Sequence, residues 1–327
     1  AGMTTRYDAA KADERDANFG MRFKNTTNTG LNYSFNYAYR KDSNPFIDLS
    51  YRDRSSGEKL TAEYIQGGSA TTGLPVTGST VSGTVITADQ IPSAITSRTV
   101  AEATAIDTAA FAGDGAMVPF LAGAATNAVT VMLKDGSGNY YGARNWDGTA
   151  TANTYNDVEL LFEEKLNRVH NIGGSFDFSV ETDANPVVIR GEWLYTKDEM
   201  TPVVDKRVLA IGDLAGALKM EKTDTFKYVI GADVTVATDL FLSGQFIQFR
   251  NLDYVDTSRT CTSQMGTSFD CSKYTADMAT LSMSNQLQKG EENKNFYSVY
   301  LSKPFGESGE GRWNNIFIYE ENGGKWN

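Results

Sequence analysis

The stretch GGSFDFSVETDANPVVIRGEWLYTKDE, residues 173–199, alternates between apolar and polar residues along most of its length. Successive side chains of a β-strand point to opposite faces of a sheet, so a period of two predicts strands with two unlike faces. The turn-forming residues Asp183–Pro186 separate two such runs. We therefore expect a β-hairpin in which each strand has one apolar and one polar face.

The same alternation recurs along the chain. It is clear in NFGMRFK (18–24), LNYSFNYAYR (31–40) and FKYVIGADVTVA (226–237), and weaker in FYSVYLSK (296–303) and WNNIFIYE (313–320). A helix does not explain the pattern, because the alternate apolar residues of 31–40 would spiral around all sides of a helix. DLFLSGQFIQFRNLDY (239–254) has apolar residues at both odd and even positions. We therefore predict a strand there, and which of its faces is the apolar one stays open.

Short and long connections alternate between the predicted strands. The short ones are 25–30, 183–186, 238–239 and 304–312, and the long ones are 41–168, 199–223 and 253–294. A soluble sandwich has no reason to gather its long loops at one end, whereas an outer-membrane barrel has short periplasmic turns and long extracellular loops. We therefore predict an all-β fold, an antiparallel transmembrane β-barrel. The Ala-, Thr- and Gly-rich segment 67–157 is expected to be a loop or a plug-like insert in this single domain.

Composition and charge narrow the functional classes. The 327 residues include 16 Tyr, 17 Phe and 4 Trp, a mixture that favours extended structure over packed helices. The net charge of −11 argues against a nucleic-acid partner, because binding phosphates needs a basic face. The sequence lacks any apolar run of the length that a membrane-spanning helix needs, but barrel strands need only about ten residues of alternating pattern.

The two cysteines, Cys261 and Cys271, lie in one polar stretch, TCTSQMGTSFDCSK. Two nearby cysteines among Ser, Thr and Gly favour a local loop disulfide, and hence an oxidising compartment. The alternative, two unrelated reduced thiols, stays open. A zinc site would need further soft ligands, and the surrounding sequence offers none.

The sequence carries no recognisable catalytic or cofactor-binding motif. His170 is the single histidine, at a predicted strand start, and the G-x-S-x-G motif of serine hydrolases is missing. DGSGNYYG (135–142) begins like a calcium loop but lacks its glycine at the sixth position and its glutamate at the twelfth, which is Trp146. A turn between two strands is the better interpretation. We expect no enzyme activity, no cofactor and no metal site.

Charged residues recur on the polar parity of the predicted strands. In a barrel they would line a water-filled lumen, and on a soluble sheet they would coat the solvent face. An aromatic girdle on the other parity favours the barrel; its candidate residues are Tyr39, Trp193, Tyr195, Phe226, Tyr228, Trp313 and Tyr319. The predicted lumen-lining residues are Arg22, Lys24, Arg40, Asp177, Arg190, Glu192, Lys227 and Asp233.

RVHNIGGSFDFSVETDANPVVIRGEWLYTKDE and FKYVIGADVTVATDLFLSGQFIQF resemble a family of large, poorly characterised Gram-negative outer-membrane β-barrels, a domain of unknown function. In that family a G-G-S-F strand precedes an R-G-E strand, and a strand ending in a two-residue turn leads into S-G-Q-F. The matching residues are Gly173, Gly174, Ser175, Phe176, Arg190, Gly191, Glu192, Ser243, Gly244, Gln245 and Phe246. The resemblance covers 165–320 and, loosely, 18–52, and it implies envelope transport of hydrophobic or bulky compounds.

The expected function is an outer-membrane channel or porin-like transporter that passes a solute or hydrophobic compound through a charged lumen narrowed by 67–157. Its partners would be the lipid bilayer, lipopolysaccharide, the unknown transported solute and a periplasmic or envelope partner. Two alternatives stay open: a non-conducting barrel that scaffolds a partner protein or presents surface loops for adhesion, and a soluble secreted β-sandwich. Only about seven strands are clear, and the chain ends in the loop-like YEENGGKWN. We therefore expect either a fragment of a larger barrel or a fold other than a closed membrane barrel.

Overall fold

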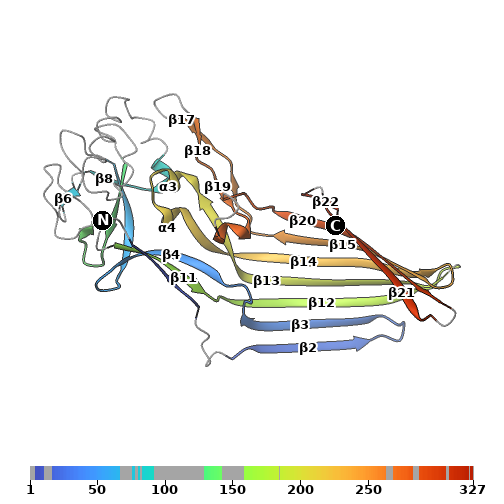
Figure 1. Ribbon diagram of the computed structural model, residues 1–327. Helices are drawn as coiled ribbons and strands as arrows, with labels where there is room; N and C mark the ends of the chain where they lie inside the picture. The colour runs from blue at the N-terminus through green and yellow to red at the C-terminus, as the bar shows by residue number, and fades with distance from the viewer. Residues whose placement is uncertain are drawn as a thin grey trace.

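The computed structural model describes residues 4–10, 17–66, 76–77, 80–81, 83–91, 129–141, 158–183, 185–262, 268–282, 287–306, 309–323 and 325–326. These residues form two main β-sheets and two small two-stranded sheets. Figure 1 shows the long strands of one main sheet running side by side, with the second main sheet at one of their ends. The predicted all-β fold is confirmed.

The larger sheet is a path of long strands, each antiparallel to its neighbours. In order across the sheet they are β2 (Phe19–Thr26), β3 (Asn32–Lys41), β12 (Arg168–Val180), β13 (Val187–Asp205), β14 (Leu218–Val236), β15 (Leu240–Asn251), β20 (Asn293–Phe305), β21 (Gly311–Glu320) and the short β22 (Lys325–Trp326). Every strand expected from the alternating pattern belongs to this sheet. Two short strands, β16 (Asp256–Thr257) and β19 (Lys273–Thr275), extend it beside the far end of β13.

The stretch 173–199 forms the expected hairpin of β12 and β13. Asp177 lies opposite Arg190 and Phe176 lies opposite Gly191, so polar residues face polar neighbours and apolar residues face apolar ones. This matched register is required wherever the two faces of a sheet meet different surroundings, because a slip by one residue would exchange the faces.

The connections separate by length, as the sequence predicts. The tight turns 27–31, 181–186, 237–239 and 306–310 lie at one end of the large sheet, on the right in Figure 1. The strand ends that the long connections 42–167, 206–217 and 252–292 join lie at the opposite end. The facing of 239–254 is also settled, because Phe246 lies opposite Ile230 on the apolar face, and Gln245 lies opposite Gly231 on the polar face.

The described residues do not form a closed barrel. Their path begins at β2 and ends at β22, and these two strands do not pair, so the sheet is only a half-barrel. The prediction of a transmembrane barrel is therefore borne out only in its all-β, antiparallel character.

The second main sheet lies at the long-connection end, and we call it the cap. It contains β1 (Thr4–Asp8), β11 (Val158–Lys165), β4 (Phe46–Asp53), β5 (Lys59–Gln66), β9 (Val129–Lys134) and β10 (Tyr140–Tyr141), with β8 (Thr84–Ile86) paired to β5. A hairpin around 54–58 joins β4 to β5, and the turn expected at 135–142 joins β9 to β10. One pairing departs from the predicted antiparallel arrangement, because β1 runs parallel to β11.

The cap has a buried hydrophobic core. One cluster of buried side chains contains Tyr51, Leu60, Leu133, Tyr141, Val158 and Leu160. Another contains Ile86, Ile91, Val129, Val131, Val208, Ile211 and Ala217. The second cluster includes residues of two short helices, α3 (Lys206–Ala210) and α4 (Leu214–Ala217).

The predicted insert 67–157 falls largely outside the described residues. Its described parts include β8, β9 and β10, which belong to the cap, and the small β6–β7 hairpin (Val76–Thr77 and Thr80–Val81). Its role as a loop or a plug stays a prediction. Among the described residues, none of the helices is long and apolar enough to cross a membrane.

Candidate functional site: the charged face of the large sheet

The large sheet has one charged face, and its strand register brings the eight predicted lumen residues onto it. Residues that lie directly opposite each other on neighbouring strands point to the same face of the sheet. Asp177 is opposite Arg190, and Lys227 is opposite Leu194. The complete set on this face is Arg22 and Lys24 of β2, Arg40 of β3, Asp177 of β12, Arg190 and Glu192 of β13, and Lys227 and Asp233 of β14. That these residues line a lumen stays a prediction.

Part of this set forms a bonded network. The Arg190 guanidinium lies between two strands, with Nε 3.3 Å from Asp233 Oδ2 and Nη2 3.3 Å from Ser243 Oγ. Asn32 Nδ2 donates to Asp177 Oδ2 at 2.8 Å. Such cross-strand pairs fix the register while keeping the charges on one face.

Glu199 belongs to the same face, although its parity in the sequence puts it on the other. Its carboxylate accepts from Lys227 Nζ at 3.0 Å and from Thr225 Oγ1 at 2.5 Å. The cause is a β-bulge after Thr196, where the register with β14 shifts by one residue and Asp198 adopts a φ of 65°. A bulge adds one residue to one strand and so reverses the facing of everything beyond it.

Other charged groups on this face have no partner in the described part of the chain. Arg22 and Lys24 lie on the fully exposed strand β2, and Glu192 is exposed in the middle of β13. No side-chain hydrogen bond or ion pair joins any of the three to another described residue. Arg40, nearer the cap, donates to the backbone carbonyl of Lys41 at 3.1 Å. Unpaired charges in a concave face are available to water or to a ligand.

Between the charges, the face is covered by small polar side chains that are themselves buried. Ser34 is 2% exposed and Ser243 2%, and Ser34 Oγ lies 2.8 Å from Ser175 Oγ across the β3–β12 pair. Ser302 Oγ donates to Asn314 Oδ1 at 2.7 Å near the turn end. Small hydroxyl residues satisfy one another there and leave room above them for larger side chains.

The opposite face shows the reverse pattern of burial. Phe35 is 55% exposed and Ile230 50%, although both are large apolar residues in the middle of central strands. The same face carries exposed Phe19, Met21, Phe23, Ile172, Tyr297, Val299, Trp313 and Phe317. An exposed apolar surface this extensive is rare on a water-soluble monomer and marks contact with another protein, a membrane or a ligand.

Aromatic rings form a continuous row across this apolar face. The ring centroids of Tyr228 and Phe246 are 5.9 Å apart, those of Phe246 and Tyr297 are 5.2 Å apart, and those of Tyr297 and Tyr319 are 6.3 Å apart. The row therefore crosses β14, β15, β20 and β21, with a diagonal step from Tyr228 to Phe246 and directly opposite pairs beyond it. Spacings of this size suit favourable tilted ring contacts.

Two glycines sit beneath aromatic rings on the same face. A Cβ at Gly191 would lie 2.4 Å from Phe176 Cε1, and one at Gly174 would lie 2.8 Å from Trp193 Nε1. Each glycine lies directly opposite its aromatic partner in the β12–β13 register. The rings of the G-G-S-F and R-G-E strands thus fold over the facing glycines, which explains why glycine interrupts both alternating runs.

A hollow of about 580 Å³ lies over the charged face. Its lining includes Arg22, Ser34, Asn36, Ser175, Glu192, Lys227 and Gln245, together with the apolar Leu194, Val229, Ile247 and Phe249. These residues come from β2, β3 and β12–β15, so the hollow crosses most of the sheet. A hollow with both charged and apolar walls can solvate ions and can also hold an amphipathic molecule.

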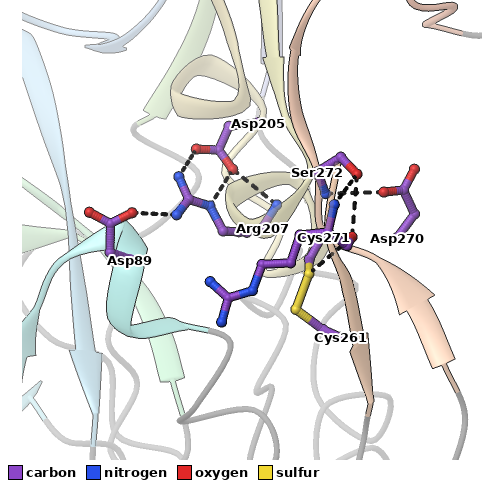
Figure 2. The surroundings of a disulfide bond; sticks show 8 residues. Asp89, Asp205, Arg207, Cys261, Asp270, Cys271 and Ser272 are labelled. Carbon is purple, nitrogen blue, oxygen red and sulfur yellow. Dashed lines mark hydrogen bonds and ion pairs between the residues drawn. A yellow bond between two sulfur atoms is a disulfide. The ribbon is translucent and has the colours of Figure 1, made fainter. Parts of the chain in front are cut away.

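The predicted disulfide is confirmed and lies in the long connection beside the cap. Cys261 and Cys271 join β17 (Thr260–Thr262) to β18 (Ser268–Asp270), with their Cα atoms 5.8 Å apart. Figure 2 shows Arg207 nearby, between Asp205, from which its Nε is 2.9 Å away, and Asp89. The bond therefore fixes a surface hairpin next to helix α3 and is remote from the charged face.

The cap also contains a carboxylate held by many donors. Asp53, at the end of β4, accepts hydrogen bonds from the backbone and hydroxyl groups of Ser55 and Ser56 and from Tyr141. The hydrogen bond from Ser55 is the largest of the effects that hold the pKa of Asp53 well below its usual range. The negative charge of this group stabilises the turn between β4 and β5.

His170 is placed among aromatic rings. Its Nδ1 lies 2.9 Å from the Tyr37 hydroxyl, and its ring centroid lies 4.6 Å from that of Tyr39. These contacts suit a histidine that packs among aromatic side chains near the start of a strand, where the sequence predicts it. Within the described ranges, no three His, Cys, Asp or Glu residues are grouped so that they could hold a metal ion.

No protein-family model, curated protein or solved structure matches this chain. The resemblance to outer-membrane barrels therefore stays a prediction.

Proposed function

We propose that this protein is an outer-membrane channel or porin-like transporter, whose large sheet forms part of a transmembrane wall. The apolar face contacts lipid, and the charged face borders the water-filled path of the solute. The tight turns lie in the periplasm, and the cap stands outside the membrane at the mouth of the path.

The inverted burial of the large sheet carries this proposal. Large apolar residues such as Phe35 and Ile230 are half-exposed, whereas Ser34 and Ser243 on the charged face are buried. In water, exposing this much apolar surface would cost free energy at about 25 cal/mol for each Å². In a bilayer the same surface is solvated by acyl chains, and no second protein layer is needed.

The length of the apolar stretch supports the same conclusion. On β13 the apolar parity runs from Val187 to Tyr195, and on β14 from Val234 to Phe226, which lies opposite Tyr195. Eight steps at about 3.3 Å give about 26 Å along the strand. Transmembrane strands need about 9–11 residues, and the apolar band of outer-membrane barrels is about 25 Å tall.

Charge supports a solute path on the other face. Cations from β2 and β3 and the Arg190–Asp233 pair give that face charges of both signs. Inside a membrane, ionisable side chains face a protein interior or a water-filled cavity, because exposing them to lipid is costly. The hollow over the charged face is where such a path would run.

The test is reconstitution of the purified protein into planar lipid bilayers, preceded by fractionation with and without detergent. We expect a protein that needs detergent or lipid to stay dispersed and that produces stepwise ion conductance. The double variant Arg22→Glu with Lys24→Glu should shift selectivity toward cations, because it reverses two unpaired charges on the path. Lys59→Glu, which changes an exposed cap residue, should leave selectivity unchanged.

The outcomes separate the alternatives. A membrane protein that never conducts would favour the scaffold or adhesion role and contradict the channel. A protein that stays monomeric and dispersed in water without detergent would contradict the membrane role itself and favour a secreted β-sandwich.

A further inference from the structure

The charged face is not uniform across its width. On β2 and β3 its charged residues are Arg22, Lys24 and Arg40, and neither strand contains an acidic residue. The side chains of Arg22 and Lys24 form no hydrogen bond or ion pair with other described residues, and both lie on an exposed strand. This side of the face is therefore a cationic wall with two uncompensated charges.

The other side of the same face carries a cluster of apolar residues, with the charged Glu192 and Lys227 among them. Val229 lies opposite Ile247, and Ile247 lies opposite Phe296, at positions where β2, β3 and β12 carry polar groups. Phe249 is 42% exposed, and its ring centroid is 5.6 Å from that of Phe296. Leu194 extends this apolar wall toward β12. Exposed apolar side chains inside a polar, water-filled face are costly unless they contact something apolar.

Both walls border one hollow; of the two unpaired cations, Arg22 lines it, and Lys24 lies two residues farther along β2. Arg22 lines it on one side, and Leu194, Val229, Ile247 and Phe249 line it on the other. Between them lies Gly173, which has no side chain to fill the space. Five strand steps separate β2 from β15, or about 24 Å along the sheet at about 4.8 Å for each step.

We propose that this hollow is a binding site for an anionic amphiphile, a molecule with an extended apolar chain and one negatively charged head group. The head group pairs with Arg22 and Lys24, and the chain lies along Leu194, Val229, Ile247 and Phe249. The occupant is a free amphiphile taken from water, not a lipid of the surrounding bilayer. This inference rests on the proposed function, because it names the class of solute that the transporter would carry.

Both ends of the site select the ligand. The cationic wall favours a carboxylate, sulfate or phosphate head group and disfavours a cationic one. The apolar wall favours a long chain, since burying each further methylene away from water strengthens binding. A small anion would meet only half of the site, and a neutral or cationic amphiphile would meet only the other half.

The experiment is equilibrium binding to the full chain in phosphatidylcholine nanodiscs, with binding to empty nanodiscs subtracted. The probes are laurate, dodecyltrimethylammonium, which has the same chain with the opposite charge, and acetate, which has the same head group without a chain. We expect saturable laurate binding, with affinity at least tenfold higher than for either comparison ligand.

Variants at each wall should act separately. Arg22→Gln with Lys24→Gln should weaken laurate binding at least tenfold and abolish the preference for laurate over dodecyltrimethylammonium. Phe249→Ser should weaken both twelve-carbon ligands by a similar factor. The matched controls are Lys59→Gln, an exposed cap cation, and Leu252→Ser, an exposed apolar residue just beyond β15, and both should bind like the parent. Heat-dependent gel mobility verifies that each variant is folded.

Three results would overturn the inference. One is equal affinity for laurate and dodecyltrimethylammonium, and another is unchanged laurate affinity in the Arg22 and Lys24 variant. The third is loss of laurate binding when phosphatidylglycerol enters the nanodisc, which would assign the site to a lipid head group. Each can occur in a protein that conducts normally, so failure of this inference and failure of the channel function are distinguishable.

Discussion

Replacing Ile230 by lysine should distinguish a lipid-facing sheet from a water-facing one by the sign of its effect. Ile230 lies in the middle of the nine-residue apolar stretch of β14 and is 50% exposed. On a sheet in water, Ile230→Lys would replace an exposed apolar residue by a solvated one and change stability by roughly 0.5 kcal/mol or less. At the middle of a bilayer, lysine on a lipid-facing strand costs about 2–4 kcal/mol.

That penalty is large enough to measure. At about 1.4 kcal/mol for each factor of ten, it lowers the folding equilibrium constant by roughly thirty- to several-hundredfold. The assay is urea-dependent refolding into phospholipid vesicles, followed by tryptophan fluorescence and by heat-dependent gel mobility. The midpoint should move to lower urea concentration by the corresponding amount.

The matched control is the neighbouring residue on the other face. Val229 lies at the same depth and directly opposite Glu192. In Val229→Lys the new ammonium group reaches the charged face and can pair with that carboxylate, so the change should be within about 1 kcal/mol. A second control, Val234→Lys, moves the charge about 13 Å along β14 toward the turns, where the penalty should fall to about 0–1 kcal/mol. The reasoning is refuted if Ile230→Lys is neutral or stabilising, or if both faces respond alike.

Three further changes address other parts of the molecule. Cys271→Ser opens a disulfide that spans 10 residues, so the chain-entropy model gives a local loss of about 2.7 kcal/mol, and amide exchange in 260–270 should accelerate by roughly a hundredfold; unchanged exchange would contradict it. Asp53→Asn removes a charged acceptor and should destabilise the cap by about 2 kcal/mol. Hydrogen bonds, chiefly that from Ser55, lower the pKa of Asp53 in the folded state. The parent should therefore have this stabilisation above about pH 4 and lose it as the pH falls through the folded pKa. In Asp53→Asn, amide exchange in the cap should no longer accelerate over this acid range. Gly191→Val forces the Phe176 ring aside and should cost about 1–3 kcal/mol, much of which Phe176→Ala in the same chain should recover; full additivity of the two changes would refute the contact.

The two-faced strands could be predicted from the sequence because side-chain facing follows directly from residue parity. Asp177 and Arg190 meet on one face because each differs in parity from its apolar neighbours, and no tertiary contact is needed to establish this. The disulfide was equally accessible, since Cys261 and Cys271 are the only cysteines and lie close together in the chain.

Features that depend on a partner strand could not be predicted in this way. Parity puts Glu199 on the apolar face, but the bulge near Asp198 reverses it and brings its carboxylate to Lys227. Which residues of β15 lie on the apolar face follows only from its register with β14, because the neighbours Phe246 and Ile247 are both apolar. The parallel strand β1 has only five residues, too few for an alternating pattern to stand out before its partner β11 is known.

The open edges of the large sheet constrain the proposed function most strongly. The interior of a bilayer does not tolerate unpaired backbone groups, so a transmembrane wall requires partner strands for β2 and β21. The eight long strands from β2 to β21 alternate in direction, so the two edges run antiparallel and could pair with each other. However, side chains fill the interior of an eight-stranded barrel, so such a barrel would have no open path for a solute. Measurable conductance would therefore mean that further strands join these edges, and the size of each conductance step would report how wide the completed barrel is.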